Sequence, residues 1–193
     1  EAHNRSDDSV TWTQIRSFIK GSIEAVFKKC PLSLEDYTNF DEISIERCRL
    51  TYEQRKEAYS IYVRYEDMLK SEALWDDCDR VNMLLWRSNF VPLAKANGEG
   101  ADYLRVYVDE VQDSTQAECC LYFLAAGFDI HALFLAGDPA QSVVEGVDFR
   151  FEEVRSIVHK LKARKGEKKE RIEKPIILST NYRSHSGILD AAG

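Results

Sequence analysis

The chain has 193 residues, of which 44% are hydrophobic and 31% are charged, a composition typical of one medium or two small globular domains. Its apolar runs, such as residues 132–136, are far too short to cross a bilayer, and the polar N-terminus carries no signal peptide. These features exclude a membrane-spanning protein and predict an intracellular one. Because the chain begins without Met, we expect it to start inside a longer protein.

The charge balance is acidic, with a formal net charge of −7 and a pI near 5.2. Phosphate contacts dominate the affinity of nucleic-acid-binding domains, which are therefore usually basic. The balance argues against tight binding of DNA or RNA by this chain alone, but not against binding through another domain of the same protein. Residues 162–174 form a run of mixed charges, which predicts a solvated loop or helix extension.

The five cysteines are odd in number and include no C-x-x-C pair, and the four histidines do not join them at the spacing of zinc ligands. We therefore expect reduced, mostly buried thiols.

The first half of the chain has the pattern of a helical region. Apolar residues recur at helical spacing over 15–27, which predicts one helix. A second helix is expected to begin at Thr51, with Gln54 three residues later as its capping-box partner. A third follows Asp76 and carries its apolar residues within 81–86. No internal repeats are visible.

The pattern changes after residue 103, where short β-forming runs begin to alternate with helical stretches. The runs cover 104–108, 132–136 and 176–178. Strands that alternate with helices predict a parallel sheet with crossover helices, and continuous apolar strands suit a sheet buried on both faces. The predicted fold class is therefore α/β.

Two helices are expected between these runs. The first begins near Asp113 or Thr115, which are both suitable N-caps. The second is indicated by apolar residues at helical spacing over 151–161.

Polar residues follow the first predicted strand, at the edge of the sheet where ligands bind in α/β folds. An aspartate at the position of Asp109 can hold Mg²⁺, and the adjacent Glu110 can polarise a water for attack on a phosphate. The alternative is that both residues merely start the next helix.

The other two strands also end in polar groups. Gln141 can hydrogen-bond a terminal phosphate, although Gly137 and Asp138 before it are equally typical of a simple turn. Arg183 can neutralise charge on a transferring phosphoryl group, and Tyr182 can stack on a base. The alternative is a surface arginine beside a partly buried tyrosine.

Taken together and in this order, the three strand ends resemble motifs II, III and IV of UvrD/Rep-type superfamily 1 helicases. The matching stretches are 109–113, 137–142 and 178–184. The resemblance implies a partial RecA-like parallel sheet preceded by a mostly helical accessory region. It divides the chain into the accessory region at 1–100, the C-terminal part of a first RecA-like motor domain at 101–180, and the start of a second motor domain at 181–193.

The resemblance also implies ATP and Mg²⁺ as cofactors of the parent protein, and single-stranded nucleic acid (DNA rather than RNA) and other domains of the same chain as its partners. The implied site residues are Asp109 as Mg²⁺ ligand, Glu110 as catalytic base, Asp138 in the nucleotide site, Gln141 as γ-phosphate sensor, Tyr182 as adenine-stacking residue and Arg183 as arginine finger.

The chain departs from the helicase pattern in two ways. No G-x-x-x-x-G-K-[ST] loop is present, so the usual cradle for the phosphates is missing and the chain alone is expected to be inactive. Residues 143–146 replace the aromatic residues that normally follow Gln141. A narrower resemblance, carried by 11–22 and 146–151, points to large eukaryotic UvrD relatives that also carry TPR and ankyrin repeats.

Two other functions compete with an ATP-dependent helicase motor. One is a degenerate helicase-like fold that acts as a non-enzymatic protein-interaction module. The other is a divalent-metal nuclease built on Asp109, Glu110 and Asp113, which leaves no role for Tyr182 and Arg183.

Overall fold

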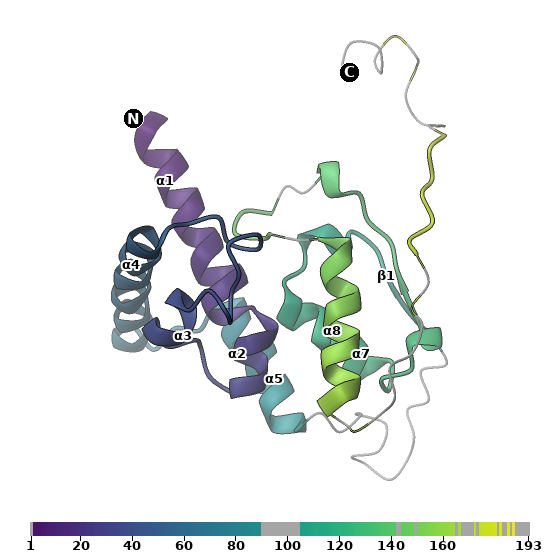
Figure 1. Cartoon of the computed structure of the whole chain (residues 1–193), viewed down its shortest axis with the longest axis horizontal. Coiled ribbons are helices and arrows are strands. Elements are labelled where there is room, and N and C mark those ends of the chain that lie inside the picture. Colours follow the sequence, from purple (N-terminus) through teal and green to yellow (C-terminus); the bar gives the residue numbers. More distant parts are fainter. Residues whose placement is uncertain are drawn as a thin grey trace.

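The computed structural model describes residues 2–89, 105–141, 144–148 and 150–164, together with 166, 172, 174–180, 182, 185 and 187. Most of these residues are helical (Figure 1). The helices are α1 (Ala2–Thr13), η1 (Gln14–Lys20), α2 (Ile23–Lys28), α3 (Leu34–Thr38), α4 (Tyr52–Ser71), α5 (Asp77–Ser88), η2 (Val111–Asp113), α7 (Gln116–Ala125), η3 (Ile130–Ala132), η4 (Pro139–Gln141) and α8 (Phe151–Arg164). The strands are β1 (Val106–Val108) and β2 (Leu133–Leu135). None of the described helices is long and apolar enough to cross a membrane.

The single helix expected over residues 15–27 is in fact two elements that follow α1. The chain leaves α1 directly into η1, a π-helix, and then breaks at Gly21 and Ser22 before α2. The Ser22 side chain caps α2 by accepting the Ala25 N–H. π-Helical turns are rare and cluster at functional sites. The apolar periodicity continues across Gly21 and Ser22, so periodicity alone could not predict this break.

The starts of α4, α5 and α7 agree with the predicted helix starts. The Thr51 side chain accepts a hydrogen bond from the N–H of Gln54. The Gln54 side chain in turn accepts one from the N–H of Thr51, which completes a capping box at α4. Asp76 caps α5 in the same way, with Asp79 as its partner. Thr115 is the N-cap of α7. Such caps depend only on residues three apart, and for that reason the sequence predicts them well.

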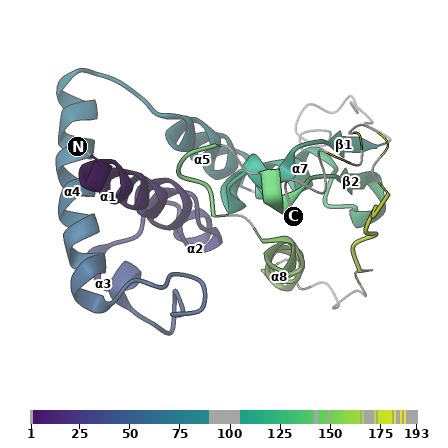
Figure 2. The ribbon, with the colours of Figure 1, turned by 90° about the horizontal axis from the view of Figure 1, so that it is seen from above.

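Two hydrophobic clusters hold the fold together. One lies between η1, α3 and α4 and contains Ile19, Tyr37 and Tyr62. The other joins α2 and α5 to α7, α8 and the sheet. In Figure 2, α1, α3 and α4 lie on one side, the sheet, α7 and α8 lie on the other, and α2 and α5 lie between them. The helical first half and the sheet therefore share a core through α2 and α5.

The sheet in the described part of the chain has two parallel strands, with Val106, Tyr107 and Val108 opposite Leu133, Phe134 and Leu135. Val108, Leu133 and Leu135 face the core. Tyr107 and Phe134 stack on the opposite face, with ring centroids 5.1 Å apart, and both are exposed. The parallel pairing of these two runs confirms that part of the prediction.

The predicted α/β class with a partial RecA-like sheet is wrong, because the described chain is mainly helical with one two-stranded sheet. The run expected to form a third strand, at 176–178, has no regular secondary structure. Its three apolar side chains, Ile176, Ile177 and Leu178, are 85–91% exposed. Without burial of these side chains, the run lacks the apolar contacts that stabilise a sheet strand. The expected domain division at residues 100 and 180 stays a prediction.

Candidate functional site

The residues that follow β1 and β2 meet at one edge of the sheet and form a strand-end cluster of Asp109, Glu110, Gln112, Asp138 and Gln141. The Gln112 amide nitrogen donates to Glu110 Oε2 at 2.6 Å, and Gln112 Oε1 accepts the Asp138 N–H at 3.0 Å. Gln141 Nε2 then donates to Asp138 Oδ2 at 2.6 Å. One hydrogen-bonded path therefore connects the two strand ends, as expected for parallel strands.

Gln112 is the centre of this cluster and is 1% exposed. It lies against Gly137, where an added Cβ would meet the Gln112 side-chain oxygen and lie 3.1 Å from Val111 Cγ1 and 3.2 Å from the Gln112 backbone nitrogen. Only glycine allows this close approach. Glu110 has a left-handed backbone (φ 54°), which costs a non-glycine residue about 1 kcal/mol. The edge is therefore closely packed and conformationally constrained.

Asp109 of the cluster and the neighbouring Asp113 each accept a backbone hydrogen bond. Asp109 Oδ1 accepts the N–H of Glu110 at 3.0 Å, and Asp113 Oδ1 accepts the N–H of Val144 at 3.4 Å. Tyr182 is 92% exposed, whereas a residue that stacks on a base is expected to be partly buried. Arg183 lies outside the described residues. The roles assigned to all six site residues stay predictions.

A second group of contacts joins the π-helix to the segment that follows the strand-end cluster. Ser17 Oγ donates to the Gly146 carbonyl at 2.6 Å and accepts the Asp148 N–H at 2.9 Å. Arg16 donates to the Glu145 carbonyl at 3.1 Å. Gly146 has φ +87°, and a Cβ there would lie 2.6 Å from the Trp12 ring. Residues of the stretch 11–22 thus contact the segment 145–148, which overlaps the second stretch noted in the sequence.

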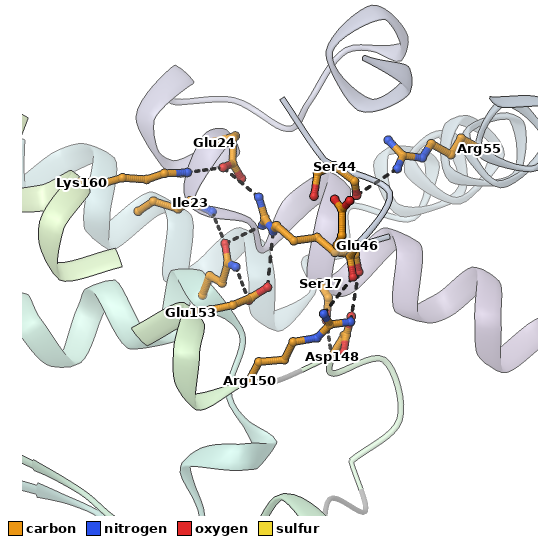
Figure 3. Close-up of polar contacts among 12 residues, drawn as sticks. Ser17, Ile23, Glu24, Ser44, Glu46, Arg55, Asp148, Arg150, Glu153 and Lys160 are labelled. Carbon is orange, nitrogen blue, oxygen red and sulfur yellow. Dashed lines mark hydrogen bonds and ion pairs between the residues drawn. The ribbon is translucent and has the colours of Figure 1, made fainter. Parts of the chain in front are cut away.

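A third group is an ionic network around the buried carboxylate of Glu24, between α2 and α8 (Figure 3). Glu24 Oε1 accepts Lys160 Nζ at 2.7 Å and Arg47 Nη1 at 3.0 Å. Arg47 also reaches Gln116 and Glu153. Burial alone would raise the pKa of the Glu24 carboxyl, but Arg47 and Lys160 hold that pKa below its ordinary value. The network ties the helical half to α7 and α8.

A fourth group is the charged cluster around the buried ammonium of Lys20, at the end of η1. Its ammonium lies 2.7 Å from Glu66, 2.6 Å from Asp76 and 2.7 Å from Asp79. Burial lowers the pKa of Lys20, but the three carboxylates more than offset this and raise that pKa above its ordinary value. These carboxylates are the one group in the described residues spaced to hold a metal ion, and the lysine already supplies the cation.

Sequence reasoning missed the Glu24 and Lys20 networks. Their partners lie far apart in the chain, as Lys20 and Asp76 do, so no local motif marks them. The available signal was weak, namely a lysine within the apolar stretch 15–27, where a charged residue needs partners. Both networks join helices that lie far apart in the sequence.

Comparison with known proteins found a relative that matches nearly the whole chain. The chain is 34% identical over 187 residues to human "TPR and ankyrin repeat-containing protein 1". The match covers 95% of this chain but 6% of that protein, so the chain spans a small part of its relative's length. No protein-family model matches the chain, and no solved structure matches it.

These findings correct the identification as a UvrD/Rep-type superfamily 1 helicase. The matched protein is named for its TPR and ankyrin repeats, and the described chain lacks the predicted RecA-like sheet. The expectation of an ATP-hydrolysing helicase of the P-loop NTPase class is wrong for the same reasons. The chain is thus similar, over nearly all of its length, to a segment of a large repeat-containing protein.

Proposed function

We propose that this chain is a non-enzymatic protein-interaction module within a larger protein. The observation that carries the proposal is its similarity to a protein named for TPR and ankyrin repeats, which are helical units whose stacked surfaces bind other proteins. The helical architecture of the described residues supports it. The prediction of single-stranded nucleic acid as a partner depended on the helicase resemblance, and it loses its support with that resemblance.

The internal contacts of the chain suit a scaffold. The Glu24 network and the contacts of Ser17 with 146–148 tie the helical half to the sheet half. A surface held rigid before binding loses less conformational entropy when a partner docks. Rigidity of this kind favours recognition of a partner.

The strand-end cluster supports a narrower proposal for cofactors. Mg²⁺ is usually held by one or two carboxylates together with waters and substrate phosphates, and Asp109 and Asp138 follow neighbouring strands. A nucleotide–Mg²⁺ complex bound there would act as a ligand that stabilises the module, without being hydrolysed. Isothermal titration with MgATP, compared between the chain and its Asp109→Asn variant, tests this proposal.

The test of the proposed function uses the protein at its natural length in its own cells. Proximity labelling compares the intact protein with a version that lacks these 193 residues, and with an Asp109→Asn/Glu110→Gln variant. We expect the deletion to lose a reproducible set of neighbouring proteins and the double variant to keep that set. The proposal fails if the deletion keeps every neighbour.

A further inference from the structure

The turn between α4 and α5 presents two large apolar side chains on a rigid support. α4 ends in a Schellman motif: Ala73 has φ 54°, its N–H bonds the Lys70 carbonyl, and the Leu74 N–H bonds the Leu69 carbonyl at 2.8 Å. The next residue but one, Asp76, is the N-cap of α5. Two helix caps therefore fix the turn on both sides.

The apolar side chains on this turn are about half exposed. Leu74 is 50% exposed and Trp75 is 56% exposed, and Met68 near the end of α4 is also exposed. Trp75 immediately precedes the N-cap of α5, where an apolar residue commonly packs against the fourth residue of the helix. That position is Arg80, so the indole has no apolar partner of this kind. Tryptophan is one of the residues enriched at the hot spots of protein interfaces.

The charge around the turn is negative. The Lys20 cluster, to which the N-cap Asp76 belongs, sets the three carboxylates of Glu66, Asp76 and Asp79 against the single ammonium of Lys20, which leaves a formal charge of −2. Their side chains are 18%, 12% and 30% exposed, so part of this charge reaches the surface. On the exposed rim, the acidic residues are Asp67, Glu72 and Asp77, and the basic ones are Arg64, Lys70 and Arg80. The six charges of the rim sum to zero, so the net negative charge around the turn is that of the Lys20 cluster.

We infer that the Leu74–Trp75 turn is a docking site for a protein segment that places basic side chains beside apolar ones. The indole and Leu74 supply apolar area, and the neighbouring carboxylates attract the partner's lysine or arginine. Cation–π contact of a basic group with the indole adds to this attraction. The inference rests on the proposed interaction function and assigns it to one surface.

The test measures binding of a 15-residue probe peptide made of Lys, Leu and Ala at amphipathic helical spacing. The matched probe has Glu in place of every Lys. We expect the basic peptide to bind the chain and to shift the Trp75 indole resonance, and Trp75→Ala to weaken binding at least tenfold. Tyr107→Ala, which removes an exposed aromatic on the sheet, serves as the control and should change binding less than twofold.

A charge reversal gives the second arm. Glu72→Lys should weaken binding of the basic peptide several-fold, whereas Glu57→Lys, 15 positions earlier on the exposed side of α4 and therefore roughly 20 Å away, should not. Equal affinity of the two peptides, equal affinity of the Trp75→Ala variant, or no binding of the basic peptide at about 1 mM overturns the inference. If Trp75→Ala keeps the cellular neighbours that the deletion loses, the docking site fails while the interaction function stands.

Discussion

Replacement of Lys20 by Met tests how strongly the Lys20 cluster holds the helical half together. The substitution keeps the length of the side chain and removes an ammonium that is 1% exposed and lies 2.6–2.7 Å from three carboxylates. Removal of one partner from a buried ion pair costs about 3–5 kcal/mol. Because the carboxylates are 12–30% exposed, water partly replaces the lysine, and we expect a loss near the lower bound, about 3 kcal/mol.

The assay is urea unfolding of the chain at pH 7, followed by tryptophan fluorescence and circular dichroism. With an m-value of about 2 kcal/mol/M, a loss of about 3 kcal/mol lowers the unfolding midpoint by about 1.5 M. The pKa of Lys20 is raised from its ordinary 10.5, so its stabilising effect is fully present below pH 10.5 and is lost only above that pH. The loss measured for Lys20→Met should therefore be similar at pH 7 and pH 9.

The matched control is Lys56→Met, which breaks an exposed ion pair with Glu53 on the same helical half. An exposed pair of this kind contributes at most about 0.5 kcal/mol. A loss below about 1 kcal/mol for Lys20→Met would refute the reasoning, because it would show that the cluster contributes no more than a surface contact.

Three further predictions concern strain, packing and thiol access. Ala73→Gly should stabilise the chain by about 0.5–1 kcal/mol because Ala73 has φ 54°, whereas Glu57→Gly in the middle of α4 should destabilise it by a similar amount. Thermal unfolding compares the two variants, and a loss of stability in Ala73→Gly would contradict the left-handed cap. Gly137→Ala should cost about 1–3 kcal/mol, since its Cβ would lie 3.2 Å from the Gln112 backbone nitrogen; an unchanged urea midpoint would be inconsistent with the close approach. Iodoacetamide at pH 8 should modify only Cys30 in the folded chain, because the other four thiols are buried and burial raises the pKa of Cys78 and Cys119 to about 12. If mass spectrometry finds that Cys119 is alkylated as fast as Cys30, this burial is contradicted.

The sequence predicted the features that depend on neighbouring residues. The Thr51–Gln54 capping box is local, and so are the start of a helix after Asp76 and the Thr115 cap. The short apolar runs at β1 and β2 also identified two parallel strands correctly. The prediction of a third strand at residues 176–178 was wrong because an apolar run forms a strand only where a hydrophobic core covers it, and these residues are exposed.

The features that the sequence did not predict depend on long-range packing. The break of the first helix at Gly21 and Ser22 places Lys20 at the end of η1, beside α4 and α5. The Lys20–Glu66 contact spans 46 positions, and the Lys160–Glu24 contact spans 136. Neither periodicity nor motif spacing reports such pairs. At the strand-end cluster, the polar residues were visible in the sequence, but the central role of Gln112 was not.

The central claim, that this chain works through contacts rather than chemistry, is tested most directly by ATP turnover of the natural-length protein and its Glu110→Gln variant. The variant keeps the size of the side chain and removes its basicity. The account predicts the same steady-state turnover for both proteins. Turnover of about 1 s⁻¹ or more, within the usual range of enzymes, that is lost in Glu110→Gln would contradict it.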